Sequence, residues 1–217
     1  MNTQTISMPS HQSNLAIIGG FSGILSIIFY VSAIALSNAI PEKIILIMAF
    51  TFPLLWIISF LGLYQLLQLE SPTATLPIAL IFGIIGSALA CTLLVIQRAN
   101  IIWHQEALAA VSEGQGEELI RAAYRGANRV QAGIDVAFDI FITIAWILFG
   151  FNIAKSQRFP SILGWSGSLL AAILLVFNMS TFPNAPAEAG LMDLGPFLGL
   201  WALIFYCWFT VVTLKNK

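Results

Sequence analysis

The chain has 217 residues, of which 59% are hydrophobic and only 9% are charged, whereas soluble domains carry about 25% charged residues. Its formal net charge is −1, which argues against a nucleic-acid partner because such partners attract basic surfaces. These values exclude an ordinary soluble domain and indicate an integral membrane protein.

Apolar runs of about 20 residues recur along the chain, each long enough to cross about 30 Å of hydrocarbon as a helix. No Lys or Arg precedes the first run, which also exceeds the length of a signal-peptide core, so we expect it to be a retained helix. We predict an all-α polytopic membrane protein with a single membrane domain over residues 1–217. Its six predicted transmembrane helices cover residues 15–37, 44–69, 75–97, 133–154, 161–182 and 196–214.

Residues 98–131, between the third and fourth predicted spans, do not have the composition of an irregular loop. An alanine-rich stretch continues the third helix, and Gly114 and Gly116 then interrupt it. Two glutamates follow, and acidic residues favour the first turn of a helix. We predict two long antiparallel helices, about 75–111 and 117–155, whose tips form an extramembrane helical hairpin on the outer face.

Polar residues of the fourth helix share one face. At about 100° per residue they fall within an arc of about 120°, and this stripe runs from the hairpin tip into the membrane. It contains Asp135 and Asp139, the two acids that lie inside a predicted span. The stripe consists of Arg121, Arg125, Asn128, Gln131, Asp135, Asp139 and Thr143.

A polar face on the third helix matches this stripe. Folding the hairpin about Gly114 gives a register in which polar residues of the two helices lie at the same height. We therefore expect the acids to face a polar cleft between the third and fourth helices. The level pairs are Gln97 with Gln131, Asn100 with Asn128, His104 with Tyr124, and Asp139 with Leu89.

Asp139 lies one helical turn deeper in the membrane than Asp135. A charged acid at the centre of a span costs about 2.5–3.5 kcal/mol, so such residues usually belong to a pathway, a binding site or a buried pair. The alternative for Asp139 is a protonated or internally bonded acid that only fixes helix packing. For Asp135 it is a hydrated carboxylate at the membrane surface. Asn178, deep in the fifth span, could join the cleft or form an interhelical hydrogen bond.

His104 does not complete a metal site, because the folded register puts it about 15–20 Å from Asp139 along the helix axis. We predict no metal site and assign no cofactor. Arg121 and Arg125 follow Glu117 at intervals of four residues, which is typical of a solvated, salt-bridged helix face. Contact with an anion or a lipid headgroup is the alternative.

A more specific pattern lies in LFGFNIAKSQRFPSILGWSGSLLAAILLV, residues 148–176. One helix ends with a glycine and an aromatic residue, Gly150 and Phe151, a short basic turn follows, and Pro160 opens a Leu- and Gly-rich helix. This stretch resembles a family of small bacterial six-helix integral membrane proteins known only as a domain of unknown function. The resemblance implies a bacterial inner-membrane protein with the basic turn in the cytoplasm.

Charge near the span ends favours the same orientation. The positive-inside rule counts basic residues in short loops close to the spans. Two compact clusters, Lys155 with Arg158 and Lys215 with Lys217, belong to the face that also carries the N-terminus. We expect both termini to be cytoplasmic.

The polar stripe favours a protein that binds or translocates a proton, a cation or a small polar or cationic solute in the cleft. Asp135 and Asp139 would hold it, with Gln97, Asn100 and Gln131 as neutral partners.

An alternative is a structural or sensory subunit that binds a partner protein through the hairpin. A lipid-modifying enzyme is disfavoured, because no Ser/His or multi-His cluster is present. Since the chain is small for a transporter, a homo-oligomer joined through Gly-x-x-x-Gly faces or the hairpin is plausible.

Overall fold

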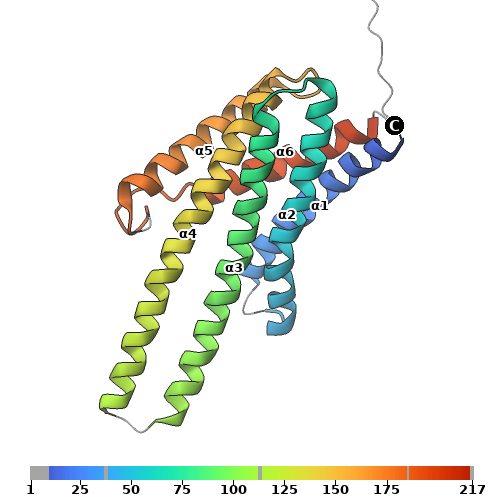
Figure 1. Cartoon of the computed structure of the whole chain (residues 1–217). Helices are drawn as coiled ribbons and strands as arrows, with labels where there is room; N and C mark the ends of the chain where they lie inside the picture. The colour runs from blue at the N-terminus through green and yellow to red at the C-terminus, as the bar shows by residue number, and fades with distance from the viewer. Residues whose placement is uncertain (1–9, 37–38, 112–113, 185, 216–217) are drawn as a thin grey trace, which may run out of the picture.

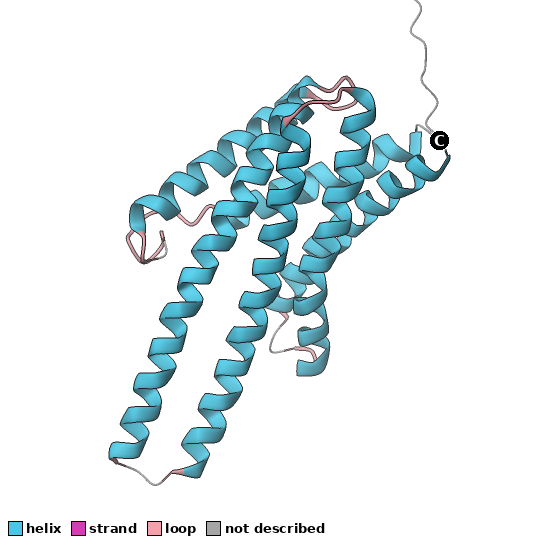
Figure 2. Cartoon of the chain, in the orientation of Figure 1, coloured by secondary structure: helices cyan, strands magenta, loops and turns pink. Residues whose placement is uncertain are grey.

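The computed structural model describes residues 10–36, 39–111, 114–184 and 186–215. Within these ranges the regular elements are all helices and no strand occurs (Figure 2). Six helices are long and apolar enough to cross a membrane, which confirms the predicted all-α, six-span fold. They are α1 (Ser10–Ala35), α2 (Glu42–Glu70), α3 (Thr75–Ala110), α4 (Gln115–Lys155), α5 (Ser161–Thr181) and α6 (Gly195–Lys215).

The third and fourth helices are much longer than a membrane crossing requires, with 36 residues in α3 and 41 in α4. Gly114, just before α4, has a φ of 133°, a conformation that side-chain-bearing residues rarely adopt. Figure 1 shows α3 and α4 running side by side and extending past the α1–α2 and α5–α6 connections. The predicted pair of long antiparallel helices is therefore confirmed, although Ser112 and Glu113 at the tip lie outside the described residues. The extramembrane position of the hairpin and its place on the outer face stay predictions.

The opposite end of the molecule carries the start of α1, the end of α6 and the α2–α3 and α4–α5 loops (Figure 1). Glu70, the last residue of α2, ties these two loops together. Its carboxylate accepts hydrogen bonds from the Ser156 hydroxyl and the Gln157 N–H, both at 2.6 Å, and lies 3.6 Å from Arg158 Nε. The loop end of the bundle is therefore closed by charge-assisted bonds.

Glycines let the helices approach closely inside the membrane, where close packing takes the place of the hydrophobic effect. A Cβ atom added to Gly19 of α1 would lie 2.8 Å from the Cα of Gly62 in α2. A Cβ added to Gly164 of α5 would overlap the α4 backbone at Gly150 and Ala154. The small-residue motifs of α1 and α5 are thus occupied within one chain and do not present a free surface to a second copy.

Aromatic side chains fill the centre of the bundle around Trp146 of α4, which is 1% exposed. Its ring lies 5.3 Å from that of Phe60 in α2 and 5.1 Å from that of Trp201 in α6, both in edge-to-face geometry. Phe205 and Tyr206 of α6 contact it at 5.8 Å. Such pairs stabilise by about 0.5–1.5 kcal/mol each beyond their buried area, so α4 joins α2 to α6 through its aromatic face.

The close contact of α4 with α5 gives a testable prediction. We expect Gly164→Ala to destabilise the protein by about 1–3 kcal/mol, because the added methyl group overpacks against backbone that cannot rotate away. Gly199→Ala is the matched control, since a Cβ there meets nothing within 4 Å and alanine favours a helix by about 1 kcal/mol. Thermal unfolding in detergent measures both, and equal midpoints for the two variants would contradict the packing described here.

Candidate functional site

The two arms of the hairpin are joined by polar and aromatic contacts in the predicted register. Asn100 Nδ2 donates to Asn128 Oδ1 at 2.8 Å. The rings of His104 and Tyr124 are stacked with their centroids 4.1 Å apart. Two of the four level pairs predicted from the sequence, Asn100 with Asn128 and His104 with Tyr124, are therefore confirmed. Since the two asparagines bond to each other, they hold the hairpin together.

Asp139 finds its hydrogen-bonding partner on α5. Asn178 Nδ2, on a side chain that is 4% exposed, donates to Asp139 Oδ2 at 3.0 Å. The neighbouring Thr143 hydroxyl donates to the main-chain oxygen of Asp139 at 2.6 Å. The interhelical hydrogen bond considered for Asn178 is confirmed, and it ties a carboxylate of α4 to α5 within the membrane-spanning part of both helices.

The direction of Asp139 differs from the expectation that the acids face α3. Other residues of α4 contact α3 and α2. Ile142 of α4 packs against Gly86 of α3, and Phe138 of α4 stacks on Trp56 of α2 with the ring centroids 6.4 Å apart. At about 100° per residue, Asp139 follows Phe138 round the helix to the α5 side. The height of the acid could be predicted from the hairpin, but which neighbouring helix it meets could not.

Two further acids lie near Asp139. Asp135, one turn towards the hairpin tip, is exposed and forms no hydrogen bond with any described residue. Asp193, in the α5–α6 loop, accepts the N–H of Gly195 at 2.8 Å. Its charge acts on both aspartates of α4. Asp135 and Asp193 are thus close enough to Asp139 for their charges to act on it, and within the described part of the chain none of the three forms an ion pair.

A row of aromatic rings runs from Tyr30 of α1 through α2 to Phe138 of α4. The charges of all three aspartates act on Tyr30 of α1, whose ring lies 5.1 Å from that of Phe52 in α2. Phe52 in turn contacts Trp56 at 5.6 Å, and Trp56 stacks on Phe138. Sequence reasoning identified neither this aromatic row nor Asp193 as part of the site, since both depend on how α1 and the α5–α6 loop fold back onto α4.

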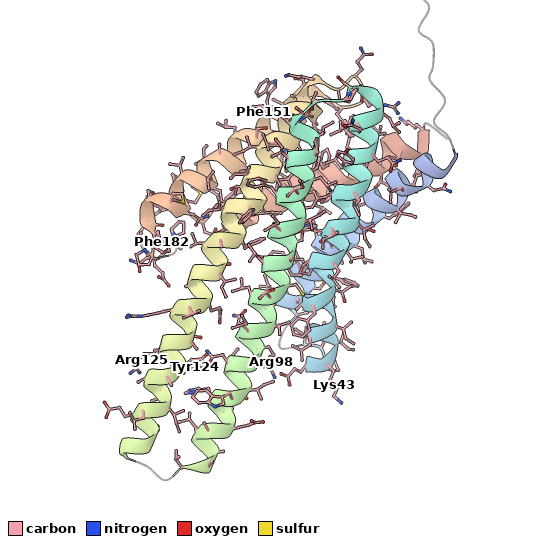
Figure 3. The ribbon with its side chains drawn as sticks, viewed as in Figure 1. Lys43, Arg98, Tyr124, Arg125, Phe151 and Phe182 are labelled. Carbon is pink, nitrogen blue, oxygen red and sulfur yellow. The ribbon has the colours of Figure 1, made fainter. Side chains whose placement is uncertain are left out.

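The remaining predicted site residues lie along the hairpin. Arg121 pairs with Glu117 at 2.5 Å, one turn away, as a solvated helix face would. Arg125 is exposed and lies on the outer side of α4, whereas Tyr124 extends towards α3 (Figure 3). Arg125 is ten residues, about 15 Å, from Asp135 along the axis, so the hairpin arginines and the acids form separate groups.

Gln97, Gln131 and His104 complete the set. Gln97 is exposed, while the Oε1 atom of Gln131 and the Nδ1 atom of His104 are buried with no hydrogen-bonding partner among the described residues.

The described part of the chain contains no group of three His, Cys, Asp or Glu side chains able to hold a metal ion. The available donors are therefore carboxylates and amides, which suit protons, hard cations and cationic organic groups.

A second polar cluster lies at the loop end of the bundle. Asn152 of α4 accepts from the Thr73 hydroxyl at 2.7 Å and donates to the Thr75 hydroxyl at 3.0 Å. Because these groups satisfy one another, the cluster serves to hold the loops in place. It borders a cavity lined by Leu67, Glu70, Ser71, Thr73, Asn152, Lys155 and Ser156.

No protein-family model, curated protein or solved structure matches this chain. The resemblance of residues 148–176 to a six-helix bacterial family therefore stays a prediction. The fold itself defines the class of protein: a polytopic membrane protein with six helices that can span the bilayer.

The Asp139–Asn178 bond can be measured by a double-mutant cycle on the free energy of unfolding. We expect Asp139→Ala and Asn178→Ala to be coupled by about 0.6–1.7 kcal/mol, the range for hydrogen bonds between membrane helices. Asp135→Ala with Asn178→Ala is the control pair and should be additive, since Asp135 shares no bond with Asn178. Additivity in both pairs would show that the bond does not form in the membrane.

Proposed function

We propose that the protein binds, and passes across the membrane, a proton, a small cation or a cationic solute at the acids between α4, α5 and the α5–α6 loop. The observation that carries this proposal is the hydrogen-bonded pair of Asp139 and Asn178 within the spans. Acids inside a span usually serve a pathway or a bound ligand. The negative charges of Asp135 and Asp193 also act on Asp139.

The surroundings of the acids support a positively charged ligand. No Lys or Arg among the described residues pairs with these three carboxylates, so a cation from outside the chain would balance their charge. The ring of Tyr30, which the charges of all three aspartates reach, would favour a cationic organic group, because aromatic faces attract cations. Gln131 lies one helical turn from Asp135 towards the hairpin tip, and its buried amide oxygen has no hydrogen-bonding partner among the described residues. It would offer a neutral contact to a ligand that moves from the hairpin towards the acids.

The proposed setting is a bacterial inner membrane with both termini in the cytoplasm. Lys155 and Lys215 lie at the loop end of the bundle, and basic residues close to span ends favour the cytoplasmic side. In this orientation the acids and the hairpin lie towards the outer face, and the ligand enters from outside the cell.

The test compares binding by the wild type with binding by Asp135→Asn/Asp139→Asn in lipid nanodiscs. The probes are chloride salts of sodium, tetramethylammonium and tetraphenylphosphonium, with titration calorimetry as the measurement and native mass spectrometry with elemental analysis for co-purified cations. We expect the double variant to bind at least about tenfold more weakly, because two neutral amides replace the charges that hold the cation.

The matched control is Glu106→Gln/Glu118→Gln, which removes two exposed hairpin acids and should bind like the wild type. A wild type that binds no probe and shows no pH-driven proton uptake in liposomes would overturn the proposal. Equal binding by the wild type and the aspartate variant would also overturn it.

A structural or sensory subunit that acts through the hairpin is the second candidate. This candidate is supported by Leu119, an apolar side chain on the proposed extramembrane part of α4 that is 72% exposed and could contact a partner protein. In that case substitutions on the hairpin surface abolish function, and Asp139→Asn has no effect.

A further inference from the structure

The hairpin has one face without charge. The contacts of Asn100 with Asn128 and of His104 with Tyr124 fix which sides of α3 and α4 meet. The side of α3 towards α2 is marked by Arg98, which pairs with Glu42. On α4 the arginines at 121, 125 and 129 point to that same side, at about 100° per residue.

The opposite side of the hairpin is apolar. On α3 it is centred on Trp103, with three alanines within about 40° of it around the helix. On α4 it is centred on Val130, with Leu119 and Ala123 within about 20°. Trp103 is 45% exposed, Leu119 72% and Val130 67%. The α3 alanines are Ala99, Ala107 and Ala110.

Lipid does not cover this whole face. The Arg98–Glu42 ion pair marks the membrane surface at the start of α2, and Val130 lies at about that height by the hairpin register. Leu119 is eleven residues further out, about 16 Å along α4. The polar headgroup layer adds only about 5–8 Å to each side of the hydrocarbon, so Leu119 extends into water. An exposed apolar face that extends beyond the lipid in this way marks a protein interaction site.

The hairpin register indicates that this partner is a second copy of the chain. Two copies in one membrane share the same height, and a two-fold axis along the membrane normal places α3 of each against α4 of the other. Trp103 of one copy then lies level with the stretch between Ala123 and Ala127 of the second copy. Leu119 lies within one residue, about 1.5 Å, of the level of Ala110, and Val130 is equally close to the level of Ala99. Every large apolar side chain of the face meets an alanine, as a side chain packing into a hole requires.

The size of the face is sufficient for such a contact. The extramembrane arms are about 24 Å long, and two helices side by side are about 20 Å wide, so each copy offers about 480 Å². The pair would bury about 1,000 Å², the lower bound of specific interfaces. Exposed Ile81 and Ile85 on α3 continue the same face into the membrane. Glu106 lies at the rim, where charged residues are usual in interfaces.

We propose that the chain forms a two-fold symmetric dimer in which the apolar faces of two hairpins pack into a four-helix bundle outside the membrane. The small-residue motifs of α1 and α5, which could otherwise join copies, are occupied inside each chain. The dimer does not depend on the cation site, which lies on the other side of α4.

Dimerisation of the purified protein in nanodiscs and detergent tests the proposal, with mass photometry and light scattering as the measurements. Ala123→Glu places a charge at the centre of the face and should raise the dimer dissociation constant at least about tenfold, because interface centres exclude unpaired charge. Ala122→Glu is the matched control: the neighbouring alanine is also exposed but points about 100° away round the helix, so the dimer should persist. A monomeric wild type, or equal effects of the two variants, would overturn the proposal.

Disulfide cross-linking gives an independent readout if a charged variant folds poorly. In a chain with Cys91 and Cys207 replaced by serine, Ala110→Cys/Leu119→Cys should give a species of dimer mass on oxidation in membranes. Ala109→Cys/Ala122→Cys, on the outer sides of the arms, should not. Quenching of Trp103 fluorescence by brominated lipid, with no cross-linked dimer, would instead show that this face lies on the bilayer.

Discussion

The register between α3 and α4 is the constraint on which the rest of the structure depends. It is set by the Asn100–Asn128 hydrogen bond and the His104–Tyr124 stack in the hairpin, and by the packing of Gly86 against Ile142 inside the membrane. Moving α4 by one turn would separate all three contacts at once. It would also carry Asp139 away from Asn178. The height of the acids, the position of the apolar face and the closure of the loop end therefore follow from one alignment of two helices.

The two ends of the bundle treat their polar groups differently. At the loop end, Glu70 receives a hydroxyl, a main-chain N–H and a guanidinium, and Asn152 is bonded on both sides. At the hairpin end, Asp135 has no bonded partner within the described chain and Asp139 has one amide donor. Unsatisfied charge costs free energy in a medium of low dielectric constant. The proposed cation would supply the positive charge that the hairpin end lacks.

The sequence was sufficient to predict features that depend on distance along the chain. Span lengths follow from bilayer thickness, the hairpin from two glycines and two glutamates, and its register from counting residues on either side of Gly114. The sequence could not predict which helices would be neighbours in the plane of the membrane. Asp139 meets α5, and Asp193 returns to α4, because of how six helices are arranged in the plane of the membrane. Hydrophobic periodicity carries little information about that arrangement when lipid and protein neighbours are equally apolar.

The length of α4 has a mechanical consequence. Its 41 residues form one unbroken helix, a stiff rod about 60 Å long. It carries the hairpin tip, the aspartates, the central Trp146 and the turn held by Glu70. Because the hairpin tip lies about 36 Å from Asp139 along this rod, a tilt of about 5° at Asp139 would displace the tip by about 3 Å.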